Sequence, residues 1–175
     1  MTEKTEQPFI LNFDSNHHAV IEPDHDQEPF HFHSRLLYAF VPKNEIDAFL
    51  DQHFHRTIGE FESVSFSPKI YEVELNGEYF TLCQAPLGGP ASVQLLDWLI
   101  SYGVNQVLTV GNAGALTDLP ENEMLLVKRA IRDEGTSFHY MEPGQFIDLK
   151  YDFLKQIENA LATLDLKYDE ITTWT

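Results

Sequence analysis

The most constraining feature of the sequence is an apolar segment, a glycine loop, an amphipathic helix and a second apolar segment that follow one another in mid-chain. Tyr79 to Cys83 predicts a buried strand, and Pro86 to Pro90 forms the loop Pro-Leu-Gly-Gly-Pro. Ala91 to Tyr102 predicts a helix, and Val107 to Val110 predicts a strand that runs into Gly111 to Gly114. Such crossovers favour parallel strands and a right-handed connection, so we expect both glycine loops at the carboxyl edge of one sheet.

Segments on either side of this crossover complete an α/β pattern. Leu36 to Val41 predicts a buried strand, and Glu45 to Phe54 predicts a helix. Asn76-Gly77 lies between two apolar runs and predicts a hairpin, while Gly103 is placed to end the preceding helix. The remaining chain predicts a strand at Met124 to Ile131, a loop at Arg132 to Pro143, a helix at Tyr151 to Leu164 and a strand at Lys167 to Thr175.

Composition places these elements in one globular domain. The chain has 175 residues, of which 43% are hydrophobic, and this is enough to form a substantial core. Residues 1–35 lack helical or strand periodicity and are rich in His, Asp and Glu, so we expect an extended acidic arm there. Residues 36–175 are then expected to form part of a single α/β domain.

Charge and cysteine content exclude several classes of function. Lys and Arg total 11 against 28 Asp and Glu, and the resulting formal charge of −17 would repel the phosphate backbone of a nucleic acid. Cys83 is the single cysteine, so no internal disulfide is predicted. No apolar run follows a basic segment near the N-terminus, and we therefore expect a cytoplasmic protein that does not bind membranes.

Both glycine loops are candidate ligand sites, although each has a purely structural alternative. Gly88 and Gly89 precede a helix, where backbone N–H groups and the helix dipole favour an anion, but a tight turn would also need glycine. Asn112 follows a buried strand and could offer a hydrogen bond to a ligand, but asparagine also tolerates the left-handed conformation of a sharp turn.

Two other clusters of polar residues are weaker candidates. Arg132 to Ser137 combines charge, glycine and hydroxyl groups after a strand, so Arg132 and Glu134 form a possible site loop; the alternative is a surface ion pair between Arg132 and a carboxylate. His31 and His33, or His53 and His55, could supply imidazole ligands to a metal. Neither pair has the i, i+4 spacing of a helical zinc site, so we predict no metal.

Taken together, several segments resemble the nucleoside phosphorylase and uridine phosphorylase family, over Phe9 to Thr175. The resemblance implies a three-layer α/β/α sandwich with a mixed central sheet, assembled as homodimers or higher homo-oligomers whose active sites are completed across the dimer interface. The segments that carry it are Ala85 to Ser92, Val110 to Ala115, Val127 to Tyr140, and the arm segments Ile10 to Asp14 and Ile21 to Pro23.

The resemblance implies cleavage of the N-glycosidic bond of a nucleoside by phosphorolysis. A pyrimidine nucleoside, in particular uridine, is the favoured substrate, phosphate is the co-substrate, and no cofactor is expected. By position, the residues implied to contact phosphate and ribose are Gly88, Gly89, Thr109, Gly111 and Asn112, and those implied to flank the base are Ala113 and Gly114.

The sequence departs from the family where phosphate is bound. Three arginines typically surround phosphate, whereas the corresponding positions here are Thr109, a residue near Phe66 and one within Asn44 to Asp47, none of them basic. Lys43 and Lys69 could substitute, although a lysine does not reproduce the two-pronged hydrogen bonding of arginine. Hydrolysis is therefore an alternative, with Glu45 as the predicted catalytic residue that positions water.

A second departure concerns the end of the sequence. In the family, the segment that Ile171 to Thr175 resembles is followed by base-recognition residues and a ribose-binding glutamate. We therefore expect a C-terminally truncated member with little or no activity by itself. The alternative is a non-catalytic interaction module, and the DNA that follows the codon for Thr175 would distinguish the two.

Overall fold

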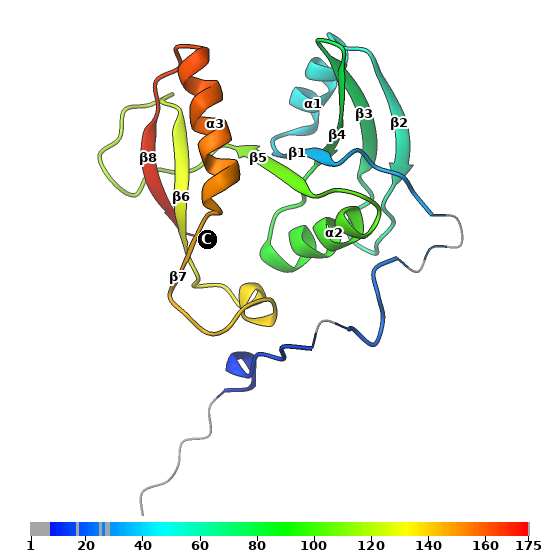
Figure 1. Cartoon of the computed structure of the whole chain (residues 1–175), viewed down its shortest axis with the longest axis vertical. Helices are drawn as coiled ribbons and strands as arrows, with labels where there is room; N and C mark the ends of the chain where they lie inside the picture. The colour runs from blue at the N-terminus through cyan, green and yellow to red at the C-terminus, as the bar shows by residue number, and fades with distance from the viewer. Residues whose placement is uncertain (1–7, 17, 25, 27–28, 175) are drawn as a thin grey trace, which may run out of the picture. The chain divides into compact units, whose positions relative to one another are not determined.

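The computed structural model describes residues 8–16, 18–24, 26 and 29–174. These residues divide into two compact units (Figure 1). The larger unit comprises the described residues between 18 and 114, and the smaller unit comprises residues 115–174 together with residues 8–16. Among the described residues, no helix is both long enough and apolar enough to cross a membrane.

The larger unit is built on a five-stranded mixed sheet with the strand order β2-β3-β4-β1-β5. Strand β1 is parallel to both β4 and β5, whereas β3 is antiparallel to both β2 and β4. The elements of this unit are β1 (Arg35–Phe40), α1 (Lys43–Leu50), β2 (His55–Glu60), β3 (Lys69–Leu75), β4 (Glu78–Gln84), α2 (Gly89–Ser101) and β5 (Gln106–Gly111).

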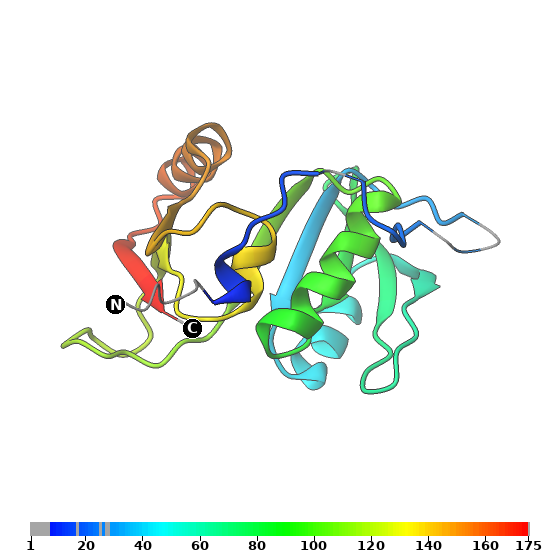
Figure 2. The same ribbon diagram turned by 90° about the horizontal axis from the view of Figure 1, so that it is seen from below.

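One helix covers each face of this sheet. Side chains alternate between the two faces along a strand, so Leu36 and Tyr38 of β1 lie in one apolar cluster and Ala39 lies in the other. The first cluster contains Leu95, Trp98 and Leu99 of α2, and the second contains Ile46 and Leu50 of α1. The three-layer α/β/α arrangement predicted from the sequence is therefore confirmed (Figure 2).

The crossover and the hairpin are also confirmed. Helix α2 connects β4 to β5, and these strands lie on opposite sides of β1 in parallel. Asn76 and Gly77 both have positive φ, of 54° and 81°, as a two-residue type I′ hairpin requires. Gly103, with φ of 121°, follows the end of α2; a Cβ there would lie 2.9 Å from the carbonyl oxygen of Phe32.

The last part of the acidic arm packs onto the larger unit. Phe32 is buried, and the rings of Phe30 and Phe32 contact Trp98 and Tyr102. Trp98 Nε1 and the Tyr102 hydroxyl donate hydrogen bonds to Asp26 at 2.8 and 2.9 Å. Asp26, Phe30 and Phe32 of the predicted arm thus contribute to the aromatic cluster beneath α2.

The smaller unit contains a three-stranded sheet, with the order β7-β6-β8, and one α-helix. Strands β6 and β8 are parallel, and Lys128 of β6 makes ion pairs with Glu158 of the helix and Glu170 of β8. The elements are η1 (Phe9–Leu11), β6 (Leu125–Ile131), η2 (Thr136–His139), β7 (Phe146–Asp148), α3 (Tyr151–Thr163) and β8 (Asp169–Trp174).

The predicted elements differ from the observed ones mainly at their ends. Helix α1 begins at Lys43 and ends at Leu50, whereas the prediction was Glu45 to Phe54, because the chain turns before entering β2. Strand β2 was not predicted, since His-Arg-Thr-Ile-Gly-Glu shows no apolar alternation. The predicted loop at Arg132 to Pro143 contains the short helix η2, and the three-residue strand β7 was also not predicted.

Candidate functional site

The carboxyl edge of β1, β4 and β5 brings the two glycine loops together. Ala39 of β1 is in register with Gln84 of β4 on one side and with Val110 of β5 on the other. The loop that contains Gly88 and Gly89 follows β4, and the loop from Asn112 to Gly114 follows β5. Both loops therefore leave the sheet at the same edge, which is where open α/β sheets bind ligands.

Short hydrogen bonds hold the end of β4 in place at this edge. The Ala85 N–H donates to the carbonyl oxygen of Ala39 at 2.8 Å, and Gln84 Nε2 donates to that of Val41 at 2.8 Å. The Tyr38 hydroxyl donates to the carbonyl oxygen of Ser92 at 2.8 Å, which ties the first turn of α2 to the sheet. Burial raises the pKa of Tyr38 well above its ordinary value, so this hydroxyl remains a donor.

The two loops use glycine for different reasons. Gly88 has φ of 96°, a conformation that other residues rarely adopt, and a Cβ there would meet no atom within 4 Å. At Gly111, a Cβ would lie 2.9 Å from Cβ of Phe40 and 3.0 Å from its carbonyl oxygen. Backbone conformation thus requires glycine at the first loop, and close contact with β1 requires it at the end of β5.

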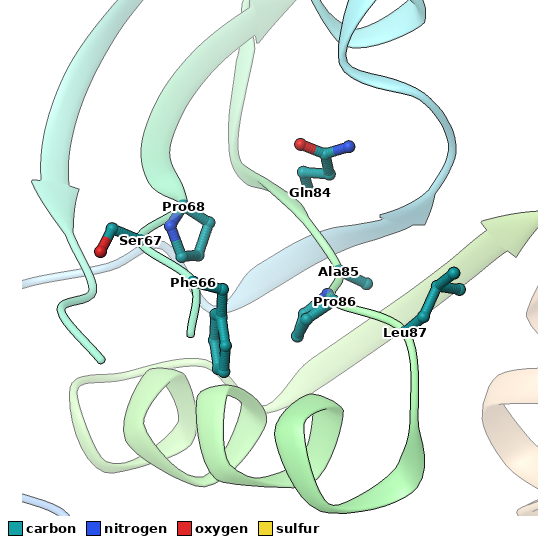
Figure 3. A pocket seen from close by; sticks show the side chains of 7 residues that line it. All are labelled: Phe66, Ser67, Pro68, Gln84, Ala85, Pro86 and Leu87. Atoms are coloured by element: carbon teal, nitrogen blue, oxygen red, sulfur yellow. The ribbon is translucent and has the colours of Figure 1, made fainter. Parts of the chain in front are cut away.

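A cavity of about 340 Å³ lies beside the first glycine loop. Figure 3 shows Phe66 and Pro68, from the segment before β3, opposite Ala85 and Pro86, from the segment after β4, with Leu87 further along the same segment. Five of the seven residues that form the walls of this cavity have apolar side chains, and the full set is Phe66, Ser67, Pro68, Gln84, Ala85, Pro86 and Leu87.

A second cavity, of about 200 Å³, shares Ser67, Pro68 and Gln84 with the first. Its walls also include Lys43, Ile46, Asp47, Lys69 and Tyr71, of which two lysines and one aspartate carry charge. Lys43 Nζ donates to both carboxylate oxygens of Asp47, at 2.7 and 2.6 Å. The structure thus brings together Lys43 and Lys69, the two lysines that the sequence offered in place of arginine.

The predicted site residues of the larger unit lie at this edge or near it, but none of them lines either cavity. Thr109, Gly111, Asn112, Ala113 and Gly114 are exposed. Within the described residues, the Asn112 amide makes no hydrogen bond. Glu45 is also exposed, on the first turn of α1, where it accepts a hydrogen bond from the Asn44 amide at 3.5 Å.

The Arg132 loop belongs to the smaller unit, and its polar atoms are already engaged. Arg132 is only 7% exposed and donates to the Ser137 hydroxyl and to the carbonyl oxygens of Ser137, Met141 and Glu142, at 2.6–3.2 Å. Its guanidinium carbon also lies 4.7 Å from the centre of the Phe138 ring. The alternative of a surface ion pair between Arg132 and a carboxylate is wrong. The partners of Arg132 are carbonyl and hydroxyl oxygens of its own loop.

Glu134 caps the same loop. Its carboxylate accepts hydrogen bonds from the backbone N–H groups of Thr136 and Ser137, at 2.6–3.1 Å. Burial opposes ionisation, but the hydrogen bonds from Ser137 and Thr136 outweigh it, so the pKa of Glu134 lies below its ordinary value. Glu134 thus stabilises the turn into η2.

Three of the four histidines considered as metal ligands have other partners. His33 Nε2 lies 2.6 Å from the Glu72 carboxylate, His53 Nδ1 contacts the carbonyl oxygen of Phe49, and His55 Nδ1 contacts that of His53. In the part of the chain that the structure describes, no three His, Cys, Asp or Glu side chains are grouped so that they could hold a metal ion.

Sequence reasoning did not find most of the cavity residues. Phe66, Ser67 and Pro68 precede β3, and Tyr71 lies within it. The sequence feature that could have located these residues is the Asn76-Gly77 hairpin. A hairpin places the start of its first strand beside the end of its second strand. Ile70 is in register with Cys83, which brings the segment before β3 to the carboxyl edge of β4.

Comparisons with known proteins point to one family. The family model described as the phosphorylase superfamily matches residues 36–175. The chain is 29% identical over 98 residues to a guanosine phosphorylase of Halorubrum lacusprofundi, and 27% identical over 89 residues to a uridine phosphorylase of Haemophilus influenzae. These alignments cover 55% and 50% of this chain, but only 41% and 33% of the two relatives.

Solved structures show the same fold. A uridine phosphorylase from Vibrio fischeri superposes with a TM-score of 0.69 at 20% identity, over 81% of this chain and 57% of that one. A purine nucleoside phosphorylase from Toxoplasma gondii superposes with a TM-score of 0.70 at 12% identity, over 82% of this chain and 57% of that one. The chain thus spans a little over half the length of these structural neighbours.

Proposed function

The chain belongs to the phosphorylase superfamily, and we propose that the carboxyl edge of its larger unit forms part of a site that cleaves the N-glycosidic bond of a nucleoside. The observation that carries this proposal is the convergence of both glycine loops beside β1, with Gln84 and Val110 in register with the same residue, Ala39. A pyrimidine nucleoside, in particular uridine, is the favoured substrate, with phosphate as the attacking group.

The proposed roles follow from the chemistry of each loop. The loop at Gly88 and Gly89 lets an anion or a sugar approach the backbone at the start of α2. The Asn112 amide, which has no hydrogen-bond partner in the described part of the chain, orients a ribose or phosphate oxygen. Ala113 and Gly114 are small and exposed, so they allow a base to lie against the backbone.

In the proposed reaction, an oxygen of phosphate forms a bond to the anomeric carbon of the ribose as the bond to the base breaks. The electron pair of the broken bond goes to the base nitrogen, which gains the proton that hydrogen phosphate gives up, and the products are the free base and ribose 1-phosphate. Positive charge develops on the sugar during this exchange, so the site must place oxygen atoms and negative charge close to it.

Hydrolysis is the second candidate, and the partners of the arginines favour it. All four arginines of the chain have partners: Arg35 pairs with Glu78, Arg56 with Glu72, Arg129 with Asp148, and Arg132 binds oxygens of its own loop. No guanidinium in the described residues is therefore available for phosphate. Water would then attack instead, positioned by Glu45, and an unchanged rate in Glu45→Gln would exclude this role.

The test is an assay of base release from uridine, guanosine and inosine, with and without phosphate. Release that requires phosphate and yields ribose 1-phosphate supports phosphorolysis, whereas release of free ribose without phosphate supports hydrolysis. Because the chain spans a little over half the length of its structural neighbours, the longest product of the same reading frame is assayed in parallel. Absence of base release from both would contradict the proposed activity.

We also propose that the protein assembles as a homodimer or a higher homo-oligomer. This proposal rests on the family resemblance, and sedimentation velocity at several protein concentrations measures it directly. A single species with the mass of one chain at all concentrations would contradict it.

A further inference from the structure

We propose that Tyr38, a buried residue of β1, positions the loop at Gly88 and Gly89 for ligand binding. The Tyr38 hydroxyl reaches the first turn of α2 and donates a hydrogen bond to the carbonyl oxygen of Ser92 at 2.8 Å. Tyr38 acts through this loop and need not touch the ligand, so it is a positioning residue. The inference rests on the proposed function, which places an anion or a sugar at the loop.

The first argument is the place of Tyr38 in the sheet. Tyr38 is in register with Cys83 of β4 on one side and with Thr109 of β5 on the other, and these are the two strands that lead into the glycine loops. Only 2% of Tyr38 is exposed, and the residue belongs to the apolar cluster that α2 and the sheet share. Tyr38 therefore lies between the sheet and the helix that begins at the first loop.

The second argument is that a hydroxyl at this depth needs a partner. Burial of a hydroxyl among apolar groups costs free energy unless the hydroxyl is hydrogen-bonded, and a phenylalanine ring would fill the same space without this cost. The Tyr38 hydroxyl donates to the Ser92 carbonyl oxygen and accepts a longer hydrogen bond, of 3.4 Å, from the Ser92 hydroxyl. Burial also raises the pKa of Tyr38, so the phenol keeps the proton that it donates. What tyrosine adds over phenylalanine here is thus a link to the first turn of α2.

The third argument is that this turn has no side-chain cap of its own. Gly88 occupies the N-cap position and has no side chain that could accept a hydrogen bond, and Pro90 in the first turn has no backbone N–H. The Ser92 N–H donates to the carbonyl oxygen of Gly88 at 3.0 Å. A chain of hydrogen bonds therefore runs from Tyr38 through Ser92 to Gly88, and it holds the turn from the side of the sheet.

The fourth argument is that packing does not restrain the loop between its ends. Leu87 is 86% exposed, and a Cβ at Gly88 would meet no atom within 4 Å. Glycine also has more backbone freedom than any other residue. The loop is therefore held at its two ends, by the hydrogen bond of Ala85 to Ala39 and by that of Tyr38 to Ser92. A ligand binds more tightly when a larger fraction of the molecules already holds the loop in the binding conformation.

The decisive variant is Tyr38→Phe, which removes the hydroxyl and keeps the ring. The ring lies 5.5 Å from that of Phe40, and Phe40 in turn lies against Gly111, where the second loop begins. Because the variant keeps these contacts, its effect is confined to the bond with Ser92. Tyr79→Phe is the matched control, since the Tyr79 hydroxyl donates to Glu74 at 3.1 Å within the β3–β4 hairpin.

The first measurement is amide hydrogen exchange by NMR in the chain of 175 residues, without any ligand. We expect the Ser92 amide to exchange about fivefold faster in Tyr38→Phe, as the loss of one hydrogen bond implies. Amides next to Asn76 and Gly77 should keep their rates, because local opening of the hairpin leaves the Tyr38 bond intact. In Tyr79→Phe, we expect exchange at Ser92 to be unchanged.

The second measurement is the steady-state kinetics of base release by the longest product of the reading frame. In Tyr38→Phe we expect KM for the substrate that contacts the loop to rise about fivefold at unchanged kcat, because fewer free molecules hold the binding conformation. A loss of stability alone would lower the amount of active enzyme and leave KM as it is. In Tyr79→Phe, both constants should stay unchanged.

The inference is overturned if Ser92 exchanges at the same rate with and without the Tyr38 hydroxyl. It is also overturned if the hairpin amides accelerate as much as Ser92 does, or if kcat falls while KM for both substrates stays constant, because Tyr38 would then support the fold as a whole. Absence of base release from the unaltered protein would contradict the proposed function instead. The exchange rates would still decide whether Tyr38 holds the loop.

Discussion

The Arg132 loop and the carboxyl edge of the larger unit are both rich in polar groups, but the partners of these groups differ. In the Arg132 loop, the guanidinium and the Glu134 carboxylate are bound by atoms of the same loop. At the carboxyl edge, the Asn112 amide and the Lys69 ammonium have no partner among the described residues. Polar groups that are already bonded contribute to stability, whereas exposed groups without a partner can bind a ligand without losing an existing hydrogen bond.

The largest effect that tests this contrast is expected from Arg132→Met. The substitution removes the donors to the carbonyl oxygens of Ser137, Met141 and Glu142, in a place where Arg132 is only 7% exposed. We expect a loss of about 3 kcal/mol in the free energy of unfolding, since hydrogen bonds to charged groups contribute roughly 1.5–3 kcal/mol each and are not additive. Urea denaturation followed by tryptophan fluorescence and circular dichroism measures this loss.

Arg129→Met is the control for Arg132→Met. Arg129 lies in β6, the strand that ends just before Arg132, but its ion pair with Asp148 is exposed, so its removal should cost much less stability. Equal losses in the two variants would contradict a structural role specific to the Arg132 loop.

A second, smaller effect is expected from Gly111→Ala. The new Cβ would lie within 3.0 Å of atoms of Phe40, including its backbone oxygen, so β5 must shift away from β1. Overpacking of this kind typically costs about 1–3 kcal/mol. Gly114→Ala is the matched control, because a Cβ there meets no atom within 4 Å, and we expect a change within about 0.5 kcal/mol. Similar thermal unfolding midpoints for the two variants would show that β5 can move freely at this edge.

The parts of the fold that the sequence predicted are those with strong local patterns. The crossover, the hairpin at Asn76-Gly77 and helix α3 each follow from periodicity and turn residues within a short segment. Strand β2 has no such pattern, and its position depends on pairing with β3 and on Phe30, whose ring lies 3.1 Å from a Cβ built at Gly59. Contacts of this kind join distant segments and leave no local signal.

The candidate site was predictable to a similar extent. The glycine loops were predicted, because glycine after an apolar run marks the end of a strand. The cavities were not, because they require knowing that Ser67 and Lys69 lie beside Gln84 and Lys43. Nor could the sequence show that the guanidinium of Arg132 is fully hydrogen-bonded within its own loop. Its partners are mainly backbone carbonyl oxygens, and the directions of these oxygens depend on how the loop folds.

A third prediction concerns pH and Glu134→Gln. The pKa of Glu134 is lowered in the folded protein, so its ionised form stabilises the fold at pH values above the ordinary carboxyl pKa of 4.5. This stabilisation is lost as the pH falls below 4.5 toward the folded-state pKa. We therefore expect Glu134→Gln to be less stable than the unaltered chain at pH 7 and the difference to shrink in acid, as measured by urea denaturation across this range. A constant difference at all pH values would contradict a role for the charged carboxylate.

The smallest effect on stability, and the sharpest test of the contrast, is expected from Asn112→Ala. Asn112 is exposed and its amide has no hydrogen bond in the described residues, so we expect the free energy of unfolding to change by less than about 0.5 kcal/mol. If the amide orients ribose or phosphate, base release by the longest product of the reading frame should nevertheless fall about tenfold or more. Asn105→Ala, at an exposed asparagine before β5, serves as the control, with rate and stability both unchanged. An Asn112→Ala variant that unfolds more easily but cleaves at the normal rate would contradict the contrast between the Arg132 loop and the carboxyl edge. Asn112 would then resemble Arg132, because it would stabilise its own loop rather than bind a ligand.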